Sequence, residues 1–196
     1  MAESIAIFGF LKLTFRLINF ILLNMQELEL TYLAKYLPKG LKKCRKVKMI
    51  DHYIPASRLH PSIRIRKKNN YYELSRKAPI SKKDLSVQEE INIKLDQDEY
   101  KTLIKIPAKV IHKIRYYYPY QGRIAEIDIF LGKLKGLVTV EFEFKKIQEM
   151  RKFKMPDFCL ADVTHEKQSA GGHIAGRSYR DLKPLLEKYG YKKIKF

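Results

Sequence analysis

The chain has 196 residues, enough for one domain with a substantial core and too few for two full domains. Its net charge of +19 indicates a polyanionic partner such as nucleic acid, an anionic membrane or a phosphorylated small molecule. Cys44 and Cys159 form no CxxC motif or Cys/His cluster, which argues against a disulfide scaffold or a zinc site and favours a reducing, cytoplasmic setting.

The first 24 residues, MAESIAIFGFLKLTFRLINFILLN, are apolar enough to suggest a membrane span. Lys12 and Arg16 near the middle argue against a span, and Glu3 together with the lack of a small-residue cleavage site argues against a secretory signal. An amphipathic helix that lies in the membrane interface remains an alternative interpretation. We expect Met25 to be the true start, with the domain over 25–196 and residues 1–24 outside it.

From Met25 onward the chain alternates polar and apolar residues with the period of two that is typical of β-strands. The first such segment, MQELELTYLA at 25–34, places Glu27 and Glu29 on one face and leucines on the other. Further segments with this layout are SIRIRK at 62–67, NYYELSRK at 70–77, VQEEINIKL at 87–95, HKIRYYY at 112–118, RIAEIDIFLG at 123–132 and VTVEFEF at 138–144.

Helical signals are fewer. DQDEYKTLIK at 96–105 opens with acidic residues, and SYRDLKPLLEKYG at 178–190 ends at Gly190, so each predicts a helix. YPYQGR at 118–123 and LGKLKG at 131–136 contain Pro or Gly and predict hairpin turns. We interpret the basic run KGLKKCRKVK at 39–48 as a solvated loop; nucleic-acid binding through it and the aromatic YYYPY is the lesser alternative.

The polar faces of these strands are sorted by the sign of their charge. The acidic pairs are Glu27/Glu29, Glu126/Asp128 and Glu141/Glu143, and the basic pairs are Arg64/Arg66 and Lys113/Arg115. Such strands can form an open sheet with a wet face or a closed barrel with a charged interior. Pairs of like charge held close repel unless a counter-ion lies between them, which favours a barrel that binds a divalent metal and a polyphosphate.

In motif order the chain resembles the CYTH family, the triphosphate tunnel metalloenzymes. Glu27-Leu28-Glu29-Leu30-Thr31 stands where the family has ExExK, and IRIRK follows as its basic pair. HKIRYYYPYQGRIAEIDIFLGKLKGLVTVEFEF resembles the succession KxRY, ExDxF, GL and ExE, and MPDFCLADVTHE resembles a later segment with a proline, an acid and Val-Thr. The resemblance covers roughly 25–179. It implies an α+β, mainly β fold: an eight-stranded antiparallel closed barrel with a charged lumen and a few flanking helices.

The resemblance also implies roles for individual residues. The implied catalytic residues are Glu27, Glu29 and Arg115. The implied ligands of Mg²⁺ or Mn²⁺ are Glu27, Glu29, Asp128, Glu141 and Glu143. The implied phosphate-binding residues are Arg64, Arg66, Lys77, Lys113, Arg115 and Arg177, with Lys94 as a weaker candidate. The implied supporting acids are Glu90, Glu126 and Asp162.

The implied activity is metal-dependent hydrolysis of inorganic, thiamine or nucleoside triphosphate. Two alternatives stay open: adenylate cyclisation, which the family includes, and a non-catalytic polyphosphate- or nucleotide-binding module. Thr31 stands where the motif has lysine and so removes an ammonium expected near the reacting phosphate, which keeps the binding module in contention. Cys159 is interpreted as a packing residue, and the five histidines show no ligand spacing.

Overall fold

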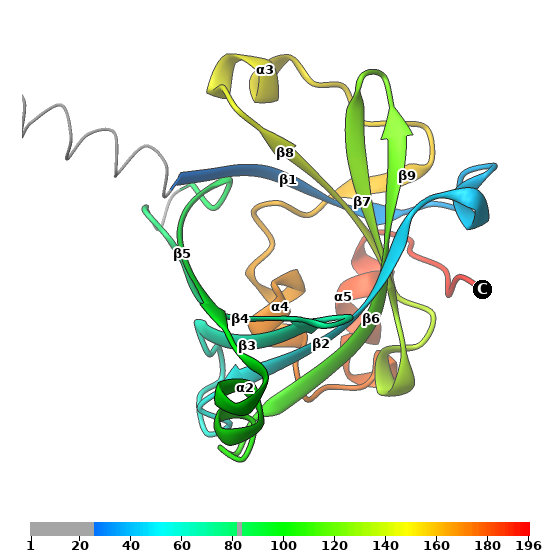
Figure 1. The fold of residues 1–196 in the computed structure, drawn as a ribbon. Helices are drawn as coiled ribbons and strands as arrows, with labels where there is room; N and C mark the ends of the chain where they lie inside the picture. The colour runs from blue at the N-terminus through cyan, green and yellow to red at the C-terminus, as the bar shows by residue number, and fades with distance from the viewer. Residues whose placement is uncertain (1–25, 82–83) are drawn as a thin grey trace, which may run out of the picture.

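The computed structural model describes residues 26–81 and 84–196; the predicted extension over 1–24 lies outside the described residues. Within them the chain forms a mainly antiparallel β structure (Figure 1). The strands are β1 (Gln26–Ala34), β2 (Lys46–Ile54), β3 (Ile63–Lys68), β4 (Tyr71–Pro79), β5 (Val87–Leu95), β6 (Lys109–Tyr120), β7 (Arg123–Phe130), β8 (Val138–Phe144) and β9 (Cys159–Asp162). No helix in the described ranges is long and apolar enough to cross a membrane.

Pairing between β1 and β5 closes the sheet into a barrel. The strand order is β5-β4-β3-β2-β6-β7-β8-β1, and the first residues of β1 also pair with β5, with Glu27 opposite Gln88. The last residues of β1 instead pair with β9, which lies outside the ring, with Tyr32 opposite Asp162. The eight-stranded antiparallel barrel predicted from the sequence is confirmed.

Short helices flank this barrel: α2 (Gln97–Leu103), α3 (Ile147–Lys152), α4 (Gly171–Ile174) and α5 (Tyr179–Lys188), with 3₁₀ turns η1 (Leu41–Lys43), η2 (Gly132–Leu134) and η3 (Lys167–Ser169). Both predicted helices are confirmed. Asp96 begins α2 and Ser178 begins α5, each in a capping box that satisfies free backbone N–H groups. After α5 the chain turns at Gly190, whose φ of 66° favours glycine.

The basic run at 39–48 differs from its interpretation as a loop. Its first part forms η1, but Lys46 and Lys48 belong to β2 and project to solvent. The alternate positions of β2 are apolar or buried, and they include Met49 and Tyr53. The same alternation that identifies the other strands therefore continues into the end of the basic run, and lysines on the wet face do not interrupt it.

The apolar core lies mainly outside the barrel wall. Outward-facing residues of β6, β7 and β8, such as Tyr116, Ile127 and Phe142, pack with Phe158 and Cys159. This packing accounts for the buried Cys159, as expected from the sequence. Because the apolar faces of these strands are buried here, their charged faces are left to line the lumen, the interior of the barrel.

A second apolar cluster closes one end of the lumen. Tyr53, Ile111 and Phe130 face inward from β2, β6 and β7 and pack with residues of α4 and α5, among them Ile174 and Leu182. Looking along the barrel, α4 and α5 lie across the opening of the ring (Figure 1). The lumen therefore has an apolar floor at this end.

Candidate functional site

A cavity of about 500 Å³ occupies the lumen. This volume is typical of pockets for small molecules. Most of the residues predicted to form the site line it: Glu27, Glu29, Arg64, Arg66, Lys77, Glu90, Lys113, Arg115, Glu126, Glu141 and Glu143. They reach it because the period-two alternation turns every second residue of each barrel strand inward.

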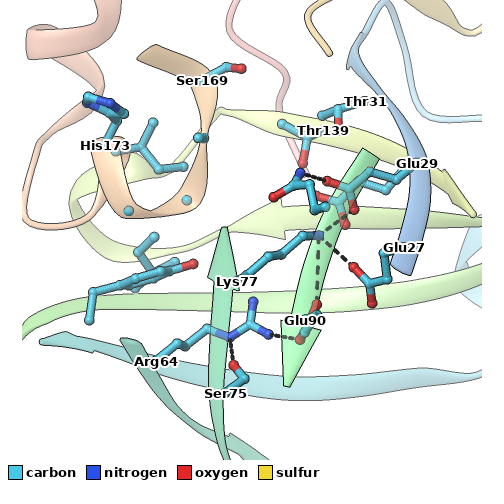
Figure 2. Close-up of a pocket in the computed structure, with 18 of the residues that line it drawn as sticks. Glu27, Glu29, Thr31, Arg64, Ser75, Lys77, Glu90, Thr139, Ser169 and His173 are labelled. Carbon is cyan, nitrogen blue, oxygen red and sulfur yellow. Dashed lines mark hydrogen bonds and ion pairs between the residues drawn. The ribbon is translucent and has the colours of Figure 1, made fainter. Parts of the chain in front are cut away.

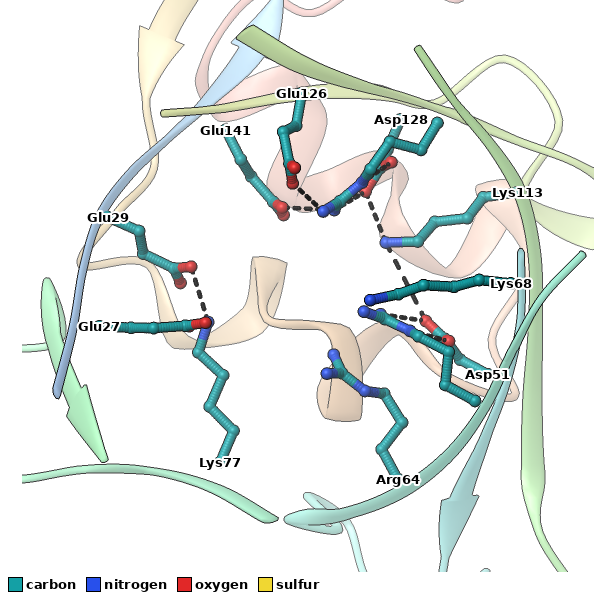
Figure 3. A network of polar contacts seen from close by, with 12 residues as sticks. Glu27, Glu29, Asp51, Arg64, Lys68, Lys77, Lys113, Glu126, Asp128 and Glu141 are labelled. Atoms are coloured by element: carbon teal, nitrogen blue, oxygen red, sulfur yellow. Dashed lines mark hydrogen bonds and ion pairs between the residues drawn. The ribbon is translucent and has the colours of Figure 1, made fainter. Parts of the chain in front are cut away.

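The lining is divided into two walls of opposite charge. The acidic wall comprises Glu27, Glu29, Glu126, Glu141 and Glu143, from the adjacent strands β1, β8 and β7. The basic wall comprises Arg64, Arg66, Lys77, Lys113 and Arg115, from β3, β4 and β6. In Figure 3 side chains of both walls point toward one central space. An anion and a cation can therefore be held side by side there.

Arg115 is the most heavily paired cation of the basic wall. Its guanidinium donates to both oxygens of Asp128, at 2.7 and 2.6 Å, to Glu141 at 2.6 Å, and to Glu126. Burial opposes the charge of Arg115, but Asp128 and Glu141 outweigh burial and raise its pKa well above the ordinary value. Arg115 is therefore a fixed cation that joins the two walls.

Asp128 is buried behind the cavity rather than lining it. It accepts from the Lys113 ammonium at 2.5 Å as well as from Arg115. Burial would raise its pKa, but Arg115 and Lys113 lower it to about 2. In this arrangement Asp128 positions two phosphate-binding candidates; its predicted role as a metal ligand stays a prediction.

Asp51 is a site residue that the sequence reasoning missed. Its carboxylate accepts two hydrogen bonds from the Arg66 guanidinium, at 2.5 and 2.7 Å, and is fully buried. Arg66 outweighs burial and holds the pKa of Asp51 below its ordinary value. The available signal was the alternation in VKMIDHYI, which places a single acid on the face of Met49 and Tyr53.

Besides Asp128, three further predicted residues lie away from the cavity lining. Asp162, in β9, accepts from the backbone N–H of Thr164 at 2.9 Å. Arg177 lies between α4 and α5, and Lys94 is an exposed residue of β5 opposite Glu73. The sequence pattern placed these residues near the site, but the fold does not direct them into the cavity.

Lys77 crosses from the basic side to the acidic wall (Figure 2). Its ammonium lies 2.8 Å from Glu27 and 2.6 Å from Glu29, with Glu90 at 3.9 Å. Burial lowers the pKa of Lys77, but Glu29 and Glu27 outweigh it and raise the pKa above the ordinary value. Arg64 lies beside this group and donates to Glu90 at 3.0 Å and to Ser75 at 3.1 Å.

The carboxyl group of Glu143 has no hydrogen bond or ion pair to any other described residue. Burial and the neighbouring Glu126 and Glu27 raise its pKa to about 7. It lies on β8 directly opposite Glu29 of β1. The acidic wall therefore contains a carboxyl group with which none of the described basic side chains pairs.

Among the described residues, no three His, Cys, Asp or Glu side chains gather closely enough to hold a metal ion as they stand. The donor set nevertheless fits a hard divalent cation, which prefers carboxylate oxygens. An ammonium already lies between Glu27 and Glu29, and Glu143 is unpaired within the described part of the chain. A cation at this wall would relieve the repulsion between the carboxylates.

In fold, the chain is similar to the inorganic triphosphatase NE1496. One crystal structure of that protein gives a TM-score of 0.56 at 22% identity, covering 76% of this chain and 94% of NE1496. Another, described as the hypothetical protein NE1496, gives 0.57 at 22% identity, covering 78% and 99%. The barrel therefore shares the fold of NE1496. The resemblance inferred from the motifs is thereby confirmed at the level of fold.

Part of the tunnel sequence also has a relative. Over 74 residues the chain is 34% identical to an inorganic triphosphatase from Acetivibrio thermocellus, a match that covers 38% of this chain. The match spans about half of that relative, 46% of its length. No protein-family model matches the chain.

Proposed function

We propose that the tunnel hydrolyses a triphosphate with the help of a divalent metal ion. The observation that carries this proposal is the pair of facing walls, acidic and basic, around one cavity with an apolar floor. A triphosphate bound to a metal presents both charges at once, so each wall would find its counterpart. The shared fold with an inorganic triphosphatase supports the same reaction class.

Each wall has a distinct task in this reaction. Arg64, Lys113 and Arg115 would hold phosphate oxygens and offset the charge that develops on the transferred and leaving groups. Asp51 and Asp128 would keep the buried cations in place. The acids proposed to hold the metal are Glu27, Glu29, Glu141 and Glu143. A bound Mg²⁺ or Mn²⁺ would supply a more acidic water and neutralise phosphate charge.

Inorganic triphosphate is the first substrate to test, because both relatives described above are named inorganic triphosphatases. Thiamine and nucleoside triphosphates belong in the same panel. The charged residues that define the site are enclosed within a barrel, which suits a small molecule better than a nucleic acid. Cys44 and Cys159 are free thiols, in keeping with the reducing cytoplasm that we propose as its location.

A binding module without turnover is the second candidate, and Thr31 is the observation that favours it. Thr31 lies opposite Glu141 and lines the cavity, so a lysine there would project an ammonium beside the acidic wall. The absence of this group would weaken stabilisation of the reacting phosphate more than it would weaken binding. Thr31→Lys should then raise turnover or change the metal preference.

The test measures phosphate and pyrophosphate released from the substrate panel with Mg²⁺, with Mn²⁺ and with chelator. We expect release that requires metal and is abolished in Glu141→Gln, because an amide is a poor ligand for a hard cation. Glu187→Gln, an exposed change on α5, is the matched control and should retain activity. Tight binding of triphosphate without release of phosphate would contradict the hydrolase and support the binding module. No binding of triphosphate at all would contradict both functions.

A further inference from the structure

Lys77 occupies the position that a cation bound to Glu27 and Glu29 would need. Its ammonium contacts one oxygen of each, at 2.8 and 2.6 Å. The other oxygen of Glu29 accepts from the Gln88 side chain at 2.9 Å. Both Glu29 oxygens therefore have protein partners, and a metal ion cannot reach this pair unless the ammonium leaves, because two cations at contact distance repel strongly.

Lys77 is also the member of the basic wall best able to move. Arg66 donates two hydrogen bonds to Asp51, and Arg115 donates two to Asp128; both of these carboxylates are fully buried. The Lys77 side chain is 23% exposed, and among the described residues its ammonium is held by carboxylates of the neighbouring strand β5 and of β1, the next strand of the ring. Its flexible four-carbon stem permits a change of rotamer with no change in the backbone.

An anion in the lumen offers Lys77 an alternative partner. Arg64, which projects from neighbouring β3, donates to the same Glu90 that Lys77 approaches (Figure 2). An anion bound by Arg64 would therefore lie within the reach of the Lys77 side chain. Moving onto this anion would leave Glu27 and Glu29 uncompensated and available to a divalent cation.

We infer that Lys77 is an internal competitor for the metal, so that the metal and the phosphate ligand bind cooperatively. This inference rests on the proposed function for the identity of the two ligands. In the free protein the Lys77 ammonium blocks the access of a metal ion to Glu27 and Glu29. When a phosphate ligand binds the ammonium instead, both carboxylates become available to the metal. Because linkage is reciprocal, a metal at the pair releases Lys77 and strengthens phosphate binding by the same factor.

The test measures Mn²⁺ binding by calorimetry in the absence of any phosphate. Lys77→Met keeps the side-chain length and removes the ammonium, so it should bind Mn²⁺ at least about fivefold more tightly than the wild type, the lower end of typical coupling. The gain should disappear in the double variant Lys77→Met/Glu29→Gln. Lys68→Met is the matched control: it removes a lumen lysine that instead pairs with Glu73, at 3.1 Å, and should change Mn²⁺ affinity much less.

Circular dichroism establishes that each variant is folded, and Lys77→Gln replaces Lys77→Met if the latter is not. Equal Mn²⁺ affinity in the wild type and the folded Lys77 variant overturns the inference, as does an equal gain in Lys68→Met. These results do not depend on turnover. If the wild type hydrolyses triphosphate but Lys77→Met shows no gain in Mn²⁺ affinity, only the competition is refuted. If the gain is observed but the wild type releases no phosphate, only the hydrolase is refuted.

Discussion

At the scale of single residues, the buried charges of the barrel depend on specific partners of opposite charge. Asp51 is fully buried and paired through both oxygens to Arg66, which is 5% exposed. A pair of this kind contributes little net stability compared with apolar residues of the same shape, but removal of one partner leaves a buried charge uncompensated. Replacing one partner should therefore reduce stability much more than replacing both.

Arg66→Ala should therefore lower the free energy of unfolding by about 3–5 kcal/mol, and Asp51→Asn in the same chain should recover part of the loss. Arg66→Lys keeps the charge but loses the planar guanidinium group. It should therefore destabilise the protein less than Arg66→Ala and still weaken triphosphate binding. Urea denaturation and calorimetry measure the two effects. A change below about 0.5 kcal/mol for Arg66→Ala would show that the pair is not buried in solution.

Glu143 gives stability a pH dependence of definite sign. Its pKa in the folded protein is about 7 against an ordinary value of 4.5, so between these values the folded state binds more protons than the unfolded state. Stability should fall as the pH rises through this window in metal-free buffer. Glu143→Gln should flatten the slope of melting temperature against pH and abolish metal-dependent turnover, while Glu187→Gln should keep the wild-type slope. An unchanged slope in Glu143→Gln would contradict the assignment.

At the scale of elements, α4 depends on two adjacent glycines to approach the barrel. A Cβ on Gly171 would lie 2.2 Å from the hydroxyl of Tyr53, and one on Gly172 would lie 2.6 Å from the His60 ring and from the backbone oxygen of Pro61. Real side chains do not tolerate such contacts, so α4 would have to withdraw from the floor of the lumen.

Gly171→Ala should destabilise the protein by about 1–3 kcal/mol through this clash. Tyr53→Phe removes the hydroxyl, and the next atom of the ring, Cζ, is then 3.1 Å from the new Cβ. The double variant should lose less stability than the sum of the two single changes, which a double-mutant cycle measures by thermal or urea denaturation. Strict additivity would mean that α4 does not contact Tyr53 in solution.

At the scale of the whole molecule, the net charge of +19 creates a field that attracts polyanions. The acidic wall by itself would repel a triphosphate. The positive potential of the whole molecule offsets this repulsion. Long-range attraction acts on the approach of the substrate and is screened within about 10 Å at 0.1 M salt.

For this reason kcat/KM for a triphosphate should fall several-fold as ionic strength rises from 0.02 to about 0.5 M, with a smaller change in kcat. Steady-state rates at fixed free Mg²⁺ measure both parameters. Phosphate bound in the lumen would be enclosed between paired side chains, where salt screens less, so the chemical step would depend little on ionic strength. A kcat that falls in parallel with kcat/KM would show that salt acts on the site itself rather than on encounter.

The strands, and the faces that carry much of the candidate site, could be predicted from the sequence because both rest on local alternation; the closed eight-stranded barrel was predicted from the sorting of charge and the family resemblance. Period two decides which residues of a strand share a face, and it placed Glu27 with Glu29, and Arg64 with Arg66, before any neighbour was known. Capping residues such as Asp96 and Ser178 likewise act within one turn of the helix that they begin.

Which strands become neighbours was decided only by the tertiary structure. The pairing of β8 with both β7 and β1 places these three strands side by side, and this gathers acidic pairs from distant parts of the chain into one wall. The closure of β1 on β5 brings Lys77 to Glu27 and Glu29, and the pairing of β2 with β3 sets Asp51 opposite Arg66. Alternation decides the direction of a side chain, but the partner it meets depends on strand order and register, which are set by the packing of the whole barrel.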